Sequence, residues 1–413
     1  MSFKDNVPQS KTAKRSFDRR RFMAGAGAAA LSFAVVKPES VRGYAANAKI
    51  RLGIVGCGGR GNWIANLFNQ NGNYEIAAAA DYFKDRVDNV AGRFNVPESK
   101  RFTGLLCERK LLEARGVDAV AIITPPYFHP EEAAQAIDAG VHVYLAKPVA
   151  VDVPGCLSIE ESGKKATDKK LCFLVDFQTR ANDFFIEAIK RVHGGDIGEY
   201  CFGESSYITG RLGKQAEPGT PEARLRNWVF DKALSGDIIT EQNIHTLDVA
   251  SWIMNAAPVY ASGTGGRKER TDVGDCWDHF ACVFVYPNNV GVAFVSKQYK
   301  DFGGQSGIRN RMFGTKGTLE TEYGGEVLIR GENFYRGGRT AQIYQEGAVN
   351  NIRTFHKDIT EGNCGNPTVA PSVRSNLVTI LGRTAAYSGE QVYWDKLLKS
   401  TERLDGRLEG LKA

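Results

Sequence analysis

The feature that most constrains this chain is a glycine-rich turn at residues 56–61, with the sequence Gly-Cys-Gly-Gly-Arg-Gly. It follows an apolar, β-branched run at 50–55 and precedes a helix-compatible segment at 62–69. The first glycine allows a tight turn, the second lets backbone approach a pyrophosphate, and the third lets the helix pack on the strand. We therefore predict a dinucleotide-binding βαβ unit, with phosphates at the helix N-terminus. An ordinary glycine-rich turn is the alternative.

An acidic residue supports nucleotide binding. A second strand-like run at 74–80 ends at Asp81, 25 residues after Gly56. A carboxylate near this spacing accepts a hydrogen bond from the ribose 2′-hydroxyl of adenosine. Because Asp81 would repel a 2′-phosphate, NAD is favoured over NADP, although Lys84 and Arg86 weaken that preference. The cofactor contacts predicted from this unit are Gly56, Cys57, Gly58, Gly59, Arg60, Gly61 and Asp81.

Strand-like and helix-like segments continue to alternate after this unit. Further strands are expected at 117–124, 141–145 and 171–175, with helices between them. This order predicts the α/β class and an N-terminal doubly wound Rossmann domain with a parallel sheet. Right-handed crossovers bring the carboxyl ends of the strands to one edge. Thr124 and Lys147 are therefore expected beside the glycine turn, where ligands bind in open α/β sheets.

The pattern changes in the second half of the chain. A long polar segment at 210–226 and a helix at 238–254 precede two alternating strands at 279–286 and 290–298. These segments predict a C-terminal α+β domain with a large, mainly antiparallel, open-faced sheet. The predicted domains are a signal peptide at 1–48, an NAD-binding Rossmann domain at 49–178, and a substrate-binding and oligomerisation domain at 179–413.

The leader carries the chain's excess positive charge. Residues 1–48 hold nine Lys/Arg and three Asp/Glu, and the other 44 basic and 44 acidic residues cancel. Arginines 19–21, followed by Phe-Met and a short apolar stretch at 23–36, resemble a twin-arginine export signal. The stretch is too short to span a membrane, so we expect export by the twin-arginine translocase to the periplasm or beyond, without a stable membrane anchor. A basic tail that stays in the cytosol is the alternative.

The body of the chain suggests neither nucleic acid nor metal as a partner. Its balanced charge gives no reason to expect binding to nucleic acid or a membrane surface. The eight cysteines are scattered without the spacing of metal ligands. We expect mostly free, buried thiols and no metal site.

Two segments carry residues suited to proton transfer. Lys147 ends a predicted core strand and precedes Pro148. Burial beside a nicotinamide and cationic neighbours would lower its pKa and suit it to acid–base work; an ordinary surface lysine is the alternative. Glu241 and His245 share one face of the predicted helix at 238–254, where Glu241 could orient and tune His245. Apolar residues border this stripe, which favours a cleft wall over a solvated face.

These motifs together resemble the Gfo/Idh/MocA family, named for glucose–fructose oxidoreductase, inositol dehydrogenase and rhizopine catabolism. The resemblance runs from residue 50 to about 320 and includes the glycine turn, 123–129, 140–148 and 241–245. It implies an NAD(P)-dependent oxidoreductase acting on CH–OH groups of a sugar, polyol or glycoside. In the family, a lysine of a Glu-Lys-Pro motif and a histidine four residues after an aspartate act at the substrate carbon, which assigns catalysis to Lys147, His245 and Glu241.

This sequence departs from the family pattern at two of these positions. Ala146 stands where the family usually has Glu, and Glu241 replaces Asp. The resemblance also implies a dimer or tetramer paired through the antiparallel sheet. For His129, a structural role is an equal alternative to contact with the cofactor. For Trp228, a packing role is an equal alternative to contact with the substrate. Further contacts implied are, for the cofactor, Thr124, Pro126, His129 and Lys147, and for substrate, Arg180, Asn227, Trp228 and His245.

Three functions fit these observations. The first is an exported oxidoreductase that keeps its nucleotide tightly bound, because the periplasm holds no recycled nicotinamide pool. The second is a redox-neutral glycosidase, in which transient oxidation permits elimination of the leaving group and readdition of water. The third is a non-catalytic sugar- or nucleotide-binding protein, supported only by Ala146.

Overall fold

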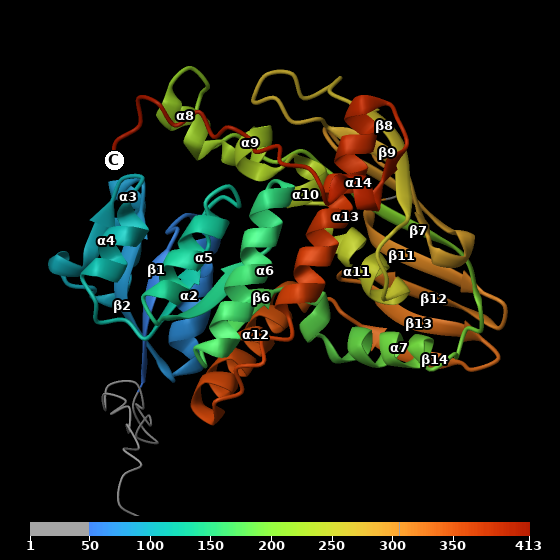
Figure 1. The fold of residues 1–413 in the computed structure, drawn as a ribbon, viewed down its shortest axis with the longest axis horizontal. Helices are drawn as coiled ribbons and strands as arrows, with labels where there is room; N and C mark the ends of the chain where they lie inside the picture. The colour runs from blue at the N-terminus through green and yellow to red at the C-terminus, as the bar shows by residue number, and fades with distance from the viewer. Residues whose placement is uncertain (1–48, 305) are drawn as a thin grey trace, which may run out of the picture. The chain divides into compact units, whose positions relative to one another are not determined.

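Two β-sheets organise the part of the chain that the structure, a computed structural model, describes: residues 49–304 and 306–413 (Figure 1). The predicted signal peptide at 1–48 lies outside the described residues. Within the described residues, no helix combines the length and apolar character needed to cross a membrane.

The first sheet has six parallel strands in the order β3-β2-β1-β4-β5-β6. Every residue of β4 is fully buried, as expected of a strand covered on both faces. The predicted Rossmann arrangement is confirmed. The strands are β1 (Ile50–Val55), β2 (Tyr74–Asp81), β3 (Arg101–Thr103), β4 (Ala119–Ile122), β5 (His142–Ala146) and β6 (Phe173–Asp176). The helices between them are α2 (Gly59–Asn71), α3 (Lys84–Phe94), α4 (Cys107–Glu113), α5 (His129–Asp138) and α6 (Val153–Asp168).

The second sheet has nine strands in the order β14-β13-β12-β11-β7-β10-β9-β8-β15. All neighbours are antiparallel except β7 and β10, so the predicted mainly antiparallel sheet is confirmed. Its strands are β7 (Tyr200–Thr209), β8 (Tyr260–Gly266), β9 (His279–Tyr286), β10 (Val290–Gln298), β11 (Gly307–Gly314), β12 (Gly317–Glu322), β13 (Glu326–Gly331), β14 (Tyr335–Arg339) and β15 (Val392–Tyr393).

Helices cover one face of this second sheet. Buried and exposed residues alternate along β9 and β10, which is the pattern of a sheet with one covered face. The larger helices of this half are α7 (Asp183–His193), α11 (Ile244–Met254), α12 (Ile343–Glu361) and α13 (Val369–Ser388). Short helical segments are α8 (Pro221–Arg226), α9 (Lys232–Ser235), α10 (Ile238–Glu241), α14 (Trp394–Leu397), η2 (Glu98–Lys100), η3 (Thr179–Ala181), η4 (Trp228–Phe230) and η5 (Pro287–Asn289).

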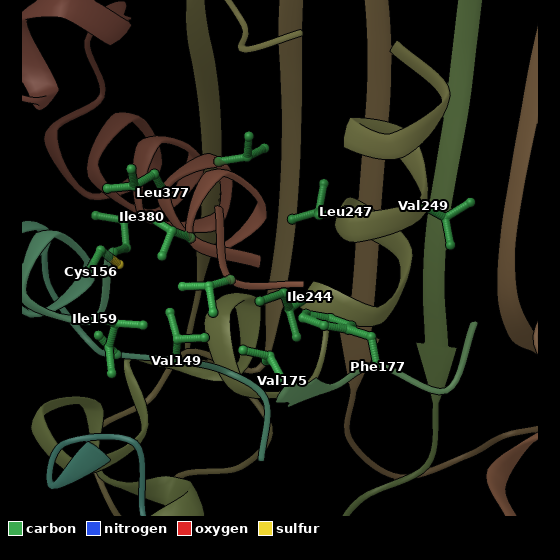
Figure 2. Close-up of a cluster of buried hydrophobic side chains, with 14 of the residues drawn as sticks. Val149, Cys156, Ile159, Val175, Phe177, Ile244, Leu247, Val249, Leu377 and Ile380 are labelled. Carbon is green, nitrogen blue, oxygen red and sulfur yellow. The ribbon is translucent and has the colours of Figure 1, made fainter. Parts of the chain in front are cut away.

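One continuous hydrophobic core joins the two sheets. Figure 2 shows side chains from α6, β6, α11 and α13 converging on one region, where α13 lies between α6 and α11. Burying these side chains stabilises the orientation of the two halves. The labelled members are Val149, Cys156, Ile159, Val175, Phe177, Ile244, Leu247, Val249, Leu377 and Ile380.

The predicted helix at 238–254 is in fact two helices. α10 ends at Glu241 and α11 begins at Ile244, so the chain bends at Gln242 and Asn243. The amide of His245 bonds to the carbonyl of Gln242 instead of continuing the i to i−4 ladder. The carbonyl oxygen of Glu241 is therefore released from the ladder and is available to another donor.

Two other helices differ from expectation. α12 was not predicted, although its buried residues recur at helical spacing along one face. α8 lies inside the segment expected to be irregular, where Thr220 caps its first turn and Pro221 occupies its first position. The domain boundary predicted at 178 falls between β6 and α7 and stays a prediction.

The chain leaves α14 and returns to the first sheet. In Figure 1 this red segment runs from α14 past α9 and α8 and ends near α3. It has no helix or strand of its own. The amide of Leu105 donates to the carbonyl of Lys412 at 2.9 Å, which fixes the segment against the loop before α4.

Candidate active site

A cavity of about 600 Å³ opens at the carboxyl edge of the first sheet and extends to the helices of the second. This is the edge at which ligands bind in open α/β folds, and the volume falls within the range of small-molecule sites. Most of the site residues expected from the sequence line it. These are Gly56, Gly58, Gly59, Arg60, Gly61, Asp81, Thr124, Pro126, Lys147, Trp228, Glu241 and His245.

The glycine turn forms one end of the cavity. Gly56 has φ +90°, and a Cβ there would lie 2.6 Å from the carbonyl carbon of Ile123. A Cβ on Gly61 would lie 1.8 Å from the carbonyl oxygen of Gly56, so the helix could not approach the turn. Gly58 is the N-cap of α2 and provides no side-chain cap, which leaves backbone N–H groups free for an anion. The turn therefore fits the pyrophosphate of a dinucleotide.

Asp81 is held rigidly beside this turn. Its carboxylate accepts the backbone N–H of Cys57 at 2.7 Å and that of Phe83 at 2.9 Å. Burial raises the pKa of the Asp81 carboxyl, and the two N–H groups and Arg86 oppose that shift. Each oxygen retains an acceptor site for a ribose hydroxyl.

Lys147 and Glu241 meet at the opposite end of the cavity. The Lys147 ammonium donates to the Glu241 carbonyl at 2.6 Å, which is the oxygen released by the break between α10 and α11, and to Oε1 at 3.1 Å. Both side chains are buried. Burial lowers the pKa of Lys147, Glu241 raises it and Arg60 lowers it further. Gln242 donates to the second oxygen of Glu241 and accepts the hydroxyl of Tyr207 at 2.7 Å, so the carboxylate is fixed from both sides.

His245 lines the same end of the cavity and lies against Tyr323, with ring centroids 5.4 Å apart. Burial, Lys147 and Arg60, in that order, hold the pKa of His245 well below its usual value, so the ring is neutral at physiological pH. Its Nδ1 atom is buried without a hydrogen-bond partner among the described residues. The expected bond between Glu241 and His245 is absent among these residues, because Glu241 is engaged by Lys147.

Asp176, which was not predicted as a site residue, ends β6 and is fully buried. Its carboxylate accepts hydrogen bonds from Arg60 and, at 2.8 Å, from Asn351 of α12. Arg60 also donates to the hydroxyl of Tyr344 at 3.0 Å, which holds the guanidinium at the cavity wall. Asp176 pairs in register with Ala146 of the neighbouring strand. The sequence feature that could have identified Asp176 is its place as an acidic residue at the carboxyl end of a predicted parallel strand.

Four of the predicted site residues lie outside the cavity lining: Cys57, His129, Arg180 and Asn227. Both ring nitrogens of His129 face backbone carbonyls, those of Pro148 and Thr124, each at 2.8 Å, which points to the structural role. The Cys57 side chain points behind the turn toward the carbonyl of Ala80. None of these four residues lines the cavity.

The other two of the four are engaged in internal contacts. Arg180 forms a two-pronged ion pair with the fully buried Asp248 and stacks on Trp252, with 5.0 Å from its guanidinium carbon to the ring centroid. Asn227 accepts the amide of Gln215 at 2.8 Å and donates to the carbonyl of Ala216 at 2.7 Å. Its role is therefore to fix the loop before α8.

Two segments of the second half of the chain lie near the glycine turn, and the first of them lines the cavity. The lid, residues 211–229, contributes Leu225 and Trp228 to the lining. Arg226 of the lid bonds to Asp85 at 2.8 Å and lies 3.9 Å from the ring centroid of Phe83.

The tail, residues 404–413, lies against both the lid and the first sheet. Arg224 of the lid donates to the carbonyl of Gly406 at 2.8 Å, and the amide of Lys412 donates to the Tyr82 hydroxyl at 3.1 Å. Leu408 and Leu411 pack on the cluster formed by Phe83, Leu225 and Leu234.

Comparison with known proteins decides the family. Residues 50–177 match the Gfo/Idh/MocA model described as an oxidoreductase family with an NAD-binding Rossmann fold, and residues 185–320 match the model of the Gfo/Idh/MocA C-terminal domain. The two matches together take in more than half of the chain. The chain belongs to the Gfo/Idh/MocA family. It is therefore an NAD-dependent oxidoreductase of CH–OH groups.

Relatives of this Gfo/Idh/MocA enzyme include inositol 2-dehydrogenase of Rhizobium meliloti strain 1021, 25% identical over 351 residues that cover 82% of this chain and 96% of the relative. A glycosyl hydrolase family 109 protein of Phocaeicola vulgatus is 25% identical over 162 residues, 38% of each chain. Aldose-aldose oxidoreductase of Caulobacter crescentus shares the fold, with a TM-score of 0.67 and 20% identity over 84% of this chain and 99% of that one.

Among the described residues, no three His, Cys, Asp or Glu side chains gather as metal ligands.

Proposed function

We propose that this chain is an exported NAD-dependent oxidoreductase that transfers hydride between nicotinamide and a hydroxyl or carbonyl carbon of a sugar, polyol or glycoside. The observation that carries the proposal is the meeting of Lys147, Glu241 and His245 at the end of a cavity that begins at the glycine turn. When bound, NAD supplies the hydride acceptor. The phosphates would lie on the turn and the adenosine ribose at Asp81.

The protein's own residues divide the proton chemistry between them. The neutral imidazole of His245 is suited to accept the hydroxyl proton as a substrate alcohol is oxidised. The Lys147 ammonium donates hydrogen bonds and stabilises negative charge on the substrate oxygen, while Glu241 keeps it charged against burial. In carbonyl reduction the same groups act in reverse order.

The substrate class is supported by the relatives. Among the similar proteins are inositol dehydrogenases, an aldose-aldose oxidoreductase and a levoglucosan dehydrogenase in complex with NADH and levoglucosan. The predicted substrate contacts that line the cavity are Trp228 and His245. NAD is preferred over NADP in this proposal because the Asp81 carboxylate faces the ribose position.

A tightly held cofactor fits the contacts that the lid and the tail make with the first half of the chain. Arg226 of the lid bonds to Asp85 of α3, and the amide of Lys412 in the tail bonds to the Tyr82 hydroxyl in the loop after β2, so these contacts must break before the two segments can move away from the cavity. The predicted twin-arginine leader at 1–48 supports transport of the folded, loaded enzyme to the periplasm or beyond.

We also propose a homo-oligomer paired through the outer face of the second sheet. Phe202, Val283 and Val295 are 48%, 45% and 48% exposed on that face. Exposed apolar side chains gathered on one sheet face are typical of an interaction surface. Val283→Lys with Val295→Lys should reduce the mass measured by light scattering to that of a monomer; an unchanged mass would refute the pairing.

The decisive experiment is the nucleotide content of residues 49–413 purified from the exported fraction. We expect denaturation to release about one NAD per chain, since the lid lines the cavity and the tail holds the lid against the first sheet. Release of NADP would overturn the Asp81 argument. An empty protein would contradict tight binding or export, and the same preparation from cytosol would separate these two explanations.

The redox-neutral glycosidase remains a second candidate because glycosyl hydrolase family 109 proteins are among the relatives. It would use the same Lys147 and His245. Hydrolysis of aryl glycosides without net formation of NADH would favour it over the oxidoreductase. Activity unchanged by Lys147→Ala would instead favour a non-catalytic binding protein.

A further inference from the structure

Cys172 and Cys364 form a close pair on the edge of the first sheet, far along the chain from each other. Their sulfur atoms lie 2.9 Å apart, although they are separated by 192 positions. Both side chains are buried, and both cysteines are free thiols in this structure. Among the described residues, no other two cysteines have sulfur atoms in such contact.

Hydrogen bonds to one asparagine hold the backbone on both sides of Cys172. β6 is the edge strand of the sheet, and its outer amides need partners. Asn366 accepts the amide of Phe173 at 2.7 Å and donates to the carbonyl of Leu171 at 3.0 Å, so it brackets Cys172. Thr368 accepts the amide of Val175 at 3.0 Å. The connection between α12 and α13 is therefore held in register along β6.

We propose that Cys172 and Cys364 form a disulfide that fastens this connection to the edge of the sheet. The two thiols exchange with a disulfide-bearing oxidant, which is reduced to two thiols while the two cysteine sulfurs lose their hydrogens and bond to each other. Oxidising compartments supply such oxidants. Export, as proposed above, would place the chain in an oxidising compartment, but formation of the disulfide does not require export.

The disulfide would hold the C-terminal end of α12, and α12 contributes Tyr344 to the wall of the candidate active site. α12 ends just before Cys364 and carries Asn351, which bonds to Asp176, and Tyr344, which bonds to Arg60. A bridge at this position closes a loop that contains every strand of the second sheet except β15. It would restrict the unfolded chain and the separation of α12 from β6.

The test uses the full chain, incubated with oxidised glutathione at pH 8.5 until the thiol titre is constant, then denatured, alkylated and digested without reductant. We expect the titre to fall by two thiols and a peptide containing Cys172 to be linked to one containing Cys364. Eight alkylated cysteines, glutathione attached to either sulfur, or a bridge between other cysteines would overturn the proposal.

A stability measurement keeps the result independent of any variant's folding. The oxidised wild-type chain should melt about 5 to 10 °C above the reduced chain, and dithiothreitol should reverse the shift. C172S/C364S should show no such difference, whereas Cys201→Ser, which alters an exposed cysteine, should keep it. An oxidised chain with an unchanged melting temperature would refute the proposal that the disulfide fixes the α12–α13 connection to β6.

Discussion

Lys147 stands among groups that shift its pKa in opposite directions. Burial and Arg60 lower the pKa, and Glu241 raises it. Glu241→Gln removes the raising influence, so the lysine should lose its proton at lower pH. We expect the alkaline limb of kcat/KM for carbonyl reduction to move down by about one pH unit or more.

The pH–rate profile of Glu241→Gln measures this shift directly. The matched control is Glu204→Gln, since Glu204 pairs with Arg311 on the second sheet and does not line the cavity. An alkaline limb that stays in place would show that another group controls it.

Asp81 provides the second prediction at this scale. Asp81→Ser removes the charge that would repel a 2′-phosphate and leaves Arg86 in the cavity wall. We expect the ratio of kcat/KM for NADP over NAD to rise at least about tenfold. Steady-state kinetics with both nucleotides measure the ratio, with Asp85→Ser as the neighbouring control. An unchanged ratio would show that Asp81 does not set cofactor choice.

The sequence predicted individual site residues where a backbone constraint or a strand end marked them. The glycines, Asp81 and Lys147 are marked in this way, and they line the cavity. Arg180 and Asn227 were assigned by resemblance alone, and their side chains are occupied by internal bonds. Which partner a polar side chain takes depends on three-dimensional packing, which spacing along the chain does not encode.

At the scale of elements, hydrophobic periodicity predicted the alternating strands and helices of the first half. It did not predict the break between α10 and α11. Both pieces are buried on nearly all sides, so their apolar residues look like one uninterrupted helix. The break coincides with a contact to Lys147, which follows β5: the released carbonyl of Glu241 accepts a hydrogen bond from its ammonium.

At the edge of β6, the side chain of Asn366 makes backbone hydrogen bonds that a neighbouring strand would otherwise make, and this role can be tested. Asn366 has φ +51°, so Asn366→Gly removes its three hydrogen bonds without backbone strain. We expect a loss of about 1 to 3 kcal/mol in the free energy of unfolding, measured in urea under reducing conditions. Asn95→Gly is the matched control, because Asn95 has φ 56° and is exposed. Equal effects in the two variants would refute the role of the side chain.

At the scale of the whole molecule, the tail links the lid to the first sheet. Removing residues 404–413 should speed the release of bound NAD about tenfold or more, because Leu408, Leu411 and the bond to Tyr82 are lost. With the bound cofactor reduced to NADH, the change in its fluorescence after rapid dilution measures the rate. Glu409→Ala, at an exposed tail position, is the control and should release NAD like the wild type. A truncated chain with an unchanged rate would show that the lid alone retains the cofactor.

The position of the tail in the chain also sets the order of events during biosynthesis. A ribosome produces residues 404–413 after the glycine turn and after every residue that lines the cavity. The glycine turn and the lid can therefore fold before the tail adds its contacts to the lid and to Tyr82. A nucleotide that arrives in that interval would bind a cavity whose lid still lacks these contacts.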